Sequence, residues 1–174
     1  MQDIADEAGI NKALLHYYFE NKDKLFEKVF MEAASHLFPK VNEVLNSDAS
    51  VFEKIEKFCD EYIDVVMENP YLPLFVINEV NQNPLFFMKK MWGAKSKPDP
   101  SKFLAQIEEE VKKGIIKPIS PLQLMMNLLS MTIFPFVAKP VFQMNFGLDE
   151  FQFQHAMEQR RKEIPKFIID SIRK

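Results

Sequence analysis

Apolar residues recur every three or four positions along most of this 174-residue chain, which is the spacing of amphipathic helices. The clearest example follows the sequence SVFE at positions 50–53, which has the spacing of a helix capping box. Its apolar stripe comprises Phe52, Ile55, Cys59, Tyr62 and Val66. No segment alternates apolar and polar residues as a half-buried strand would. The pattern therefore predicts an all-α fold.

Prolines and capping residues mark where further helices begin and end. The helices predicted from them span about 22–37, 100–113, 121–137 and 149–174. Pro39 is expected to bend or break the first of these helices, and Pro165 to kink the last. The helix after Ser120 is apolar on nearly every side, so we expect other helices to cover it from more than one direction.

Composition excludes several classes of protein. The chain is 47% hydrophobic and 27% charged, which is typical of a globular domain and not of a disordered one. Cys59 is the only cysteine, so no intrachain disulfide can form, and we expect a small core residue in a cytoplasmic protein. The most apolar run, residues 122–138, is interrupted by polar residues and a proline and falls short of the roughly 20 apolar residues of a membrane span. We therefore predict no membrane partner.

Catalytic and metal-binding patterns are missing from the sequence. It holds no glycine-rich phosphate loop and no pair of histidines at metal-ligand spacing. No base lies beside Cys59 in the sequence to activate its thiol. We therefore predict that the protein is not an enzyme and needs no cofactor.

The opening segment, IADEAGINKALLHYYFENKDKLFEKVF at residues 4–30, has the spacing of a helix-turn-helix. The small side chain of Ala5 allows close approach of a second helix, and Gly9 can adopt the left-handed conformation of a sharp turn. Asn11 can cap the next helix, on which Leu15 faces the same core. An ordinary pair of packed helices has the same spacing, so the spacing alone leaves both interpretations open.

The whole segment resembles the DNA-binding segment of the TetR family of transcriptional regulators. That family typically reads Ile-Ala-x-x-Ala-Gly-Val-Ser, then Leu-Tyr-x-Tyr/His-Phe, then Lys-x-x-Leu. It has one further helix before these, usually with basic residues, so the resemblance implies that the helix-turn-helix domain, residues 1–38, is partial here. The family usually has Tyr where this chain has His16, and its more variable position falls on Tyr17. The resemblance implies DNA contacts at Gln2, Lys12, Ala13, Leu14, His16, Tyr17, Tyr18 and Lys22.

The chemistry of these side chains suits DNA. Lys12 and His16 can donate hydrogen bonds to bases or phosphates, and Ala13 and Leu14 can contact a thymine methyl group. The hydroxyls of the two tyrosines suit phosphate oxygens. By the resemblance, Lys22 binds a phosphate at the start of the following helix and Gln2 reaches the DNA backbone from the first.

The resemblance also implies that residues 39–174 form an effector-binding and dimerisation domain. Its last two long helices would form a homodimer interface, and the partners would be a palindromic operator DNA and a small hydrophobic or aromatic effector. A partner subunit also follows from the residues themselves, because these two helices carry more apolar surface than a chain of this size needs for its core. The candidates for the pocket wall are Phe58, Tyr62, Phe75, Asn78, Phe87, Met91, Trp92, Met126, Ser130 and Phe134.

The prediction is thus a homodimeric transcriptional regulator, a repressor released by its effector. Charge supports an alternative, a helical ligand-binding or partner-binding protein that has lost DNA binding. The net charge is −3, and residues 1–40 hold five lysines against seven acidic residues, which is not the basic footprint of a DNA-binding domain. An in-frame helix with Arg or Lys encoded upstream of Met1 would favour the regulator. An enzyme ranks third, because it would need titratable groups that converge in the core.

Overall fold

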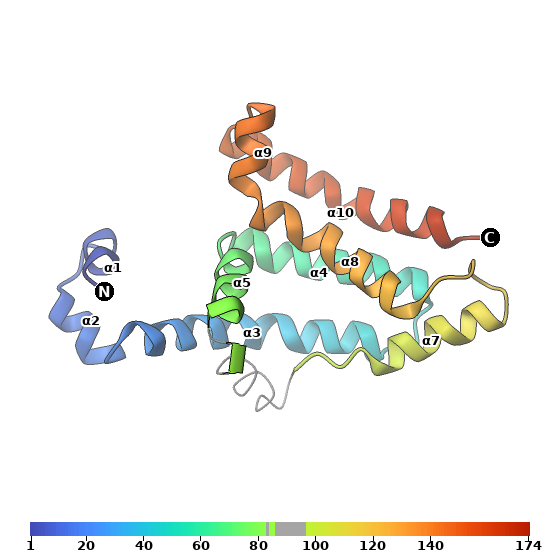
Figure 1. The fold of residues 1–174 in the computed structure, drawn as a ribbon, viewed down its shortest axis with the longest axis horizontal. Coiled ribbons are helices and arrows are strands. Elements are labelled where there is room, and N and C mark those ends of the chain that lie inside the picture. The colour runs from blue at the N-terminus through green and yellow to red at the C-terminus, as the bar shows by residue number, and fades with distance from the viewer. Residues whose placement is uncertain (83, 86–96) are drawn as a thin grey trace. The chain divides into compact units, whose positions relative to one another are not determined.

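The computed structural model describes residues 1–82, 84–85 and 97–174. These residues form two compact units, Met1–Ser35 and His36–Lys174. Within them no strand forms, and an isolated bridge pairs Ile116 with Arg173, so the predicted all-α fold is confirmed. The helices, labelled in Figure 1, are α1 (Gln2–Glu7), α2 (Lys12–Phe19), α3 (Lys22–Asn46), α4 (Val51–Glu68), α5 (Leu72–Gln82), α7 (Ser101–Lys112), α8 (Pro121–Val137), α9 (Lys139–Phe146) and α10 (Glu150–Ile172).

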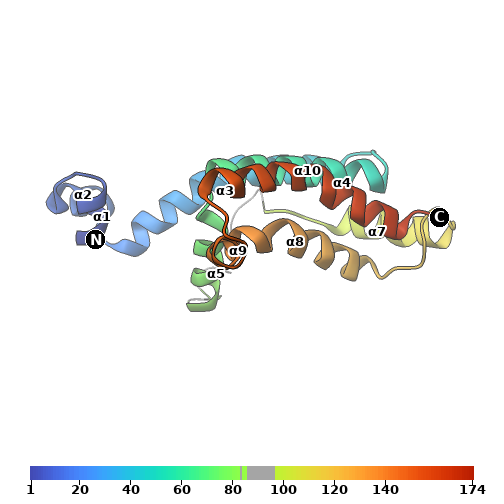
Figure 2. The ribbon, with the colours of Figure 1, turned by 90° about the horizontal axis from the view of Figure 1, so that it is seen from above.

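The core of the second unit lies where α4, α8 and α10 pack against one another. Figures 1 and 2 show α10 lying along α4, with α8 beside them. Each helix contributes a stripe of side chains that are at most 3% exposed, such as Ile55 and Phe58 of α4, Leu128 of α8, and Ile164 and Ile168 of α10. Full burial of one such side chain stabilises the fold by about 1.5–3 kcal/mol. The packing of these three helices is therefore the main source of stability of the second unit.

The predicted helix starts are confirmed at α4 and α10. The Ser50 hydroxyl accepts a hydrogen bond from the Glu53 amide at 3.3 Å, and the Glu53 carboxylate accepts one from the Ser50 amide at 2.8 Å. Hydrogen bonds from Ser50 lower the pKa of that carboxyl from its ordinary value. Asp149 and Gln152 form the same reciprocal pair at the start of α10. Both helices therefore begin where the sequence places them.

Prolines interrupt the helices less than the sequence suggests. Of the predicted bend or break at Pro39, the break is wrong, because α3 continues past this residue to Asn46. Pro165 likewise lies inside α10. The short helix α9 was not predicted at all, and it is separated from α8 by Ala138 alone. Cys59 is fully buried in α4, as predicted for a core residue.

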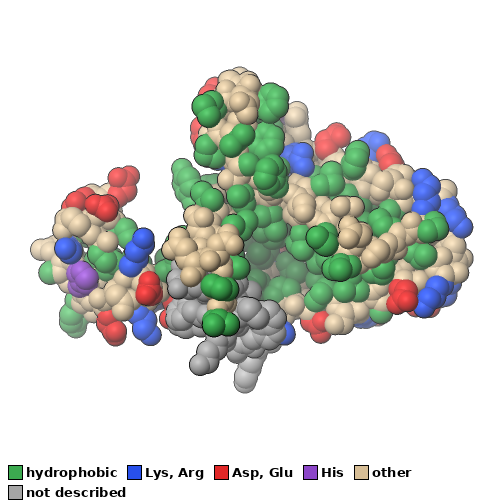
Figure 3. All heavy atoms as spheres, viewed as in Figure 1, with side chains coloured by type: hydrophobic (Ala, Val, Ile, Leu, Met, Phe, Trp, Pro, Cys, Tyr) green, Lys and Arg blue, Asp and Glu red, His purple; other side chains and the backbone are tan. Residues whose placement is uncertain are grey.

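The apolar helix α8 contacts α4, α5, α7, α9 and α10, which confirms that it is covered from several directions. One stripe nevertheless remains accessible, since Leu122, Met126 and Phe134 are 60%, 50% and 58% exposed. Figure 3 shows hydrophobic side chains gathered over α8, α9 and α5 on the face in view. In the described residues no single helix is long and apolar enough to cross a membrane. Length and composition would suffice only for α8 and α9 together, which bend by 68°.

Candidate nucleic-acid interface

The first unit contains a tight turn between two short helices that pack on each other. Ala5 of α1 and Leu15 of α2 are buried, at 0% and 4% exposure. Gly9 adopts a φ of +65°, the left-handed conformation that a side chain disfavours, and the Ile10 amide donates to the Ala5 carbonyl at 2.9 Å. The sequence prediction for all three of Ala5, Gly9 and Leu15 is confirmed.

Side-chain caps start the two helices that follow this turn, α2 and α3. The Asn11 side chain accepts a hydrogen bond from the Ala13 amide at 2.8 Å and so starts α2. The Asn21 side chain accepts from the Lys24 amide at 2.9 Å at the start of α3. Between them Glu20 has a φ of +51°, an unusual value for a residue other than glycine, which lets α2 end abruptly. The unit therefore consists of helices whose directions are set by turns and caps.

All eight side chains predicted to contact DNA are exposed in the first unit. Tyr17 and Tyr18 are the most accessible of the large ones, at 80% and 67%, and their rings meet edge to face with centroids 5.3 Å apart. His16 is already engaged, because its Nδ1 lies 3.0 Å from the Glu20 carbonyl oxygen. Gln2 also has a partner, since its amide donates to the Asp6 carboxylate at 2.7 Å. The structure thus brings six of the eight together on α2.

Charge is distributed unevenly among the three helical segments of this unit. The sequence of α2, KALLHYYF, holds Lys12 and His16 and no acidic residue. The aspartates and glutamates of residues 1–35 lie in α1, in the first part of α3 and at Glu20 after α2. The helix that carries the predicted base contacts is therefore free of acidic side chains, although residues 1–35 as a whole have four lysines against seven acidic residues.

Comparison with known proteins agrees with this geometry. The model of the family "Bacterial regulatory proteins, tetR family" matches residues 1–29, which contain the turn, the cap and all of α2. Residues 1–29 therefore match the DNA-binding segment of the tetR family of bacterial regulatory proteins. The fold agrees as well: the TetR-family transcriptional regulator PfmR from Thermus thermophilus superposes with a TM-score of 0.65 at 15% identity, over 95% of this chain and 86% of that one.

Two curated proteins match this chain over short segments. The nucleoid occlusion factor SlmA of Pasteurella multocida is 26% identical over 69 residues, covering 40% of this chain and 35% of that protein. The transcriptional repressor KstR2 of Mycolicibacterium smegmatis is 33% identical over 55 residues, covering 32% of this chain and 27% of that protein. The matched segment thus spans about a third of the length of these relatives.

The described side chains among those predicted for the effector pocket lie on three helices. Phe58 and Tyr62 of α4 stack with ring centroids 5.8 Å apart, and burial raises the pKa of the Tyr62 hydroxyl. On α5, Phe75 is half-buried and Asn78 is exposed. On α8, Met126, Ser130 and Phe134 are all exposed and lie one turn apart on one face. Phe87, Met91 and Trp92 lie outside the described residues.

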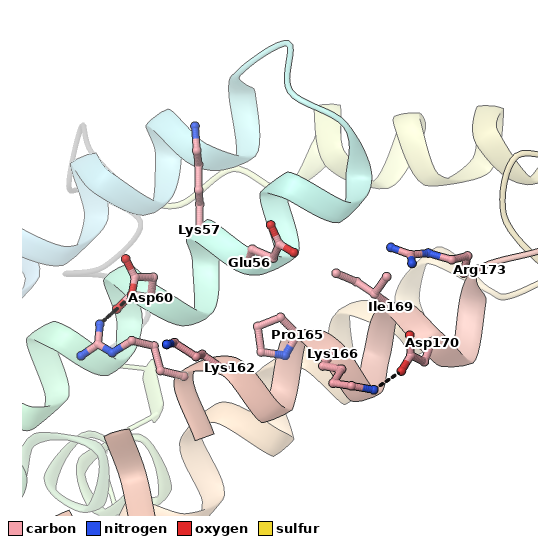
Figure 4. A pocket seen from close by; sticks show the side chains of 10 residues that line it. Glu56, Lys57, Asp60, Lys162, Pro165, Lys166, Ile169, Asp170 and Arg173 are labelled. Carbon is pink, nitrogen blue, oxygen red and sulfur yellow. Dashed lines mark hydrogen bonds and ion pairs between the residues drawn. The ribbon is translucent and has the colours of Figure 1, made fainter. Parts of the chain in front are cut away.

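A separate groove of about 540 Å³ runs between α4 and α10 and is lined mainly by charged side chains. Figure 4 shows its two walls, with Glu56 and Asp60 on α4 and Lys162 on α10. No predicted pocket residue within the described part of the chain lines this groove. Its most connected member is Arg161, which donates to the Asp60 carboxylate and to the Asp60 carbonyl at 2.7 and 3.0 Å, and pairs with Asp64 at 2.6 Å. We interpret these hydrogen bonds and ion pairs along the groove as contacts that stabilise the packing of α10 against α4.

Replacing Arg161 with alanine is therefore expected to lower the free energy of unfolding by about 1.5–3 kcal/mol, the range for hydrogen bonds to charged groups. The Arg161 side chain is only 18% exposed, so solvent screens its bonds incompletely. The Lys162→Ala variant is the matched control, because this neighbour has no ion-pair partner among the described residues. Urea unfolding should place Lys162→Ala within about 0.5 kcal/mol of the parent; equal losses in both variants would contradict the interpretation.

Lys54 and Arg160 are among the cations of the second unit that reach its core and that the sequence analysis did not predict. Lys54 is 0% exposed, and its Nζ donates to the Leu45 carbonyl at 3.0 Å and to the Gln106 side chain at 2.7 Å. Arg160 is half-buried on α10, three residues after buried Met157. In both cases the sequence feature that could have indicated burial was a basic residue among apolar residues at helical spacing.

Proposed function

We propose that this chain is a transcriptional regulator and not an enzyme, with α2 as the recognition helix that enters the major groove of DNA. The observation that carries the proposal is the arrangement of α2. Leu15 anchors it on α1, while Lys12, Tyr17 and the other predicted contacts remain accessible. In a helix-turn-helix the second helix reads base edges with side chains placed in this way. The predicted roles of Lys22 and Gln2 are backbone contacts that fix the register of α2 on the duplex.

The regulator would act as a homodimer on a palindromic operator. Two recognition helices that read both half-sites must lie about 34–36 Å apart. We propose that the interface is formed by α8 and α10, which expose Leu122 on the one helix and Phe151 and Phe167 on the other. Exposed apolar side chains of this size are often part of a protein–protein interface, and a second copy of the same helices would cover them.

A small hydrophobic or aromatic effector would release the DNA. We propose that it binds among the side chains of α4, α5 and α8 named above, whose apolar walls carry a few polar groups such as Asn78 and Ser130. Residues of α3 belong to both units, so a displacement of its second part by the effector would be transmitted to its first part. The name of the KstR2 relative, a transcriptional repressor, supports repression as the mode of action.

The proposal is tested with the protein expressed from its complete gene in a mobility-shift assay on DNA from the region upstream of that gene. We expect a complex that resists excess competitor DNA and weakens as salt is raised, because phosphate contacts release counterions. If competitor DNA displaced the protein from the upstream DNA as easily as from DNA of random sequence, the proposed regulatory function would be rejected.

A second candidate is a ligand-binding or partner-binding protein that has lost DNA binding. It is favoured by one observation, the net charge of −3 that four lysines and seven acidic residues give to residues 1–35. Under this alternative the same assay would give no competitor-resistant complex, while the second unit would still bind its ligand. The absence of acidic residues from α2 is the reason that we prefer the regulator.

A further inference from the structure

A cavity of about 300 Å³ lies between α8, α9 and α10 in the second unit. Its walls are mainly apolar, with Pro135 from α8, Phe142 from α9, and Phe153 and Met157 from α10. None of the seven predicted effector-pocket side chains that the structure describes lines it. The cavity is at the lower end of the range for small-molecule sites, about 300–1,000 Å³, so it suits a compact ligand.

Arg160 is the cationic side chain that lines this cavity, and a free carbonyl group of α8 holds its guanidinium in place. The nitrogen of Pro135 carries no hydrogen, so the Met131 carbonyl one turn earlier lacks its usual helical partner. Arg160 supplies the missing donor, because its Nη2 lies 2.8 Å from that carbonyl oxygen. The guanidinium is thereby held beside Pro135, which is itself part of the cavity wall.

The charge of Arg160 is not balanced in the part of the chain that the structure describes. No carboxylate there pairs with it, and its Nε is buried without a hydrogen-bond partner. Burial lowers the pKa of the guanidinium from its ordinary value. Glu163 also lines the cavity, but it is exposed, so water screens its charge. An unpaired cation that is partly buried is costly to a fold, and a bound anion would offset that cost.

We propose that this cavity binds a small amphipathic carboxylate, with its carboxylate on the Arg160 guanidinium and its apolar body against Phe142, Phe153 and Met157. The planar guanidinium has donors in a fork that matches a carboxylate. The apolar walls select a hydrocarbon chain or a single aromatic ring over a sugar or a nucleotide. This binding does not depend on DNA recognition, so it holds or fails separately from the proposed regulatory function.

Isothermal titration calorimetry with octanoate, octan-1-ol and octylammonium tests the proposal on the full chain. We expect octanoate to bind about tenfold or more tightly than octan-1-ol, because it adds a charged hydrogen bond, and octylammonium not to bind. Arg160→Met should lose that advantage and keep the affinity for octan-1-ol. Lys162→Met removes an exposed cation from the same helix and should leave octanoate binding unchanged.

A second variant keeps the test valid if the loss of Arg160 unfolds α8. Ala156 lines the cavity, so Ala156→Phe fills it without removing the hydrogen bond to Met131 and should abolish binding of octanoate and octan-1-ol alike. Equal affinities of the parent protein for octanoate and octan-1-ol would overturn the proposal. Undiminished octanoate binding by Ala156→Phe would overturn it as well.

Discussion

Replacing Lys12 with alanine is expected to weaken operator binding about tenfold and to reduce the slope of log K against log salt by about one unit. Lys12 is the only lysine on α2 and is exposed at its first turn. A contact with a phosphate would release one counterion, which is the origin of the change in slope. Fluorescence anisotropy of a labelled operator, titrated at several salt concentrations, measures both quantities.

Lys28→Ala is the matched control for this measurement. Lys28 is an exposed lysine of the same unit, on α3, and is not among the predicted DNA contacts. Its removal changes the net charge by the same amount, so a general electrostatic effect would lower affinity equally in both variants. Such equality would count against a specific role for Lys12. Tyr17→Phe adds a second comparison, because it removes only the hydroxyl proposed to bind a phosphate.

The second large effect is expected at Lys54, where alanine should lower the free energy of unfolding by about 3–4 kcal/mol. The Lys54 ammonium caps the C-terminal end of α3 through the Leu45 carbonyl and lies over the Phe103 ring at 5.8 Å. Helix carbonyls in the last turn have no intrahelical donor, so its removal leaves a cavity and an unsatisfied carbonyl together. Lys54→Met keeps most of the volume and should cost less. Urea unfolding of the two variants measures the difference.

The pH dependence of Lys54 has a definite sign. Burial, which disfavours the charged form, is the main reason that the pKa of Lys54 lies below 10.5. Repulsion from the positive charge of Lys102 lowers this pKa further. The unfolded chain therefore keeps this proton at pH values where the folded chain has lost it, and stability rises with pH in that interval. Between neutral pH and 10.5, the parent protein should gain stability relative to Lys54→Met. A constant difference between the two across this range would contradict the assignment.

The sequence predicted those features that depend on neighbouring residues. The capping box at Ser50, the start of the last helix at Asp149, the left-handed Gly9 and the burial of Leu15 each depend on contacts within one or two turns of helix. The exposed positions on α2 follow from the same short-range pattern. The DNA and effector contacts themselves stay predictions, because no bound molecule tests them.

Features that depend on another helix could not be predicted. The carbonyl groups that bind Lys54 and Arg160 belong to Leu45 and Met131, and no periodicity shows which helix will lie opposite. The continuation of α3 past Pro39 has the same origin, because buried neighbours such as Val41 hold it in place after one lost hydrogen bond. The sequence therefore located the helices and the candidate recognition helix but did not show that Lys54 and Arg160 lie in the core.

A photocross-linking measurement tests most directly whether α2 lies in the major groove. Tyr17 is replaced by the photoreactive amino acid p-benzoylphenylalanine in the protein expressed from its complete gene, and the complex with operator DNA is irradiated. The account predicts cross-links to nucleotides at two positions about one helical turn apart, the spacing of two half-sites. The same replacement at Tyr71, which is 73% exposed in the second unit, should give none. A complex that forms but cross-links at neither half-site from position 17 would contradict the account.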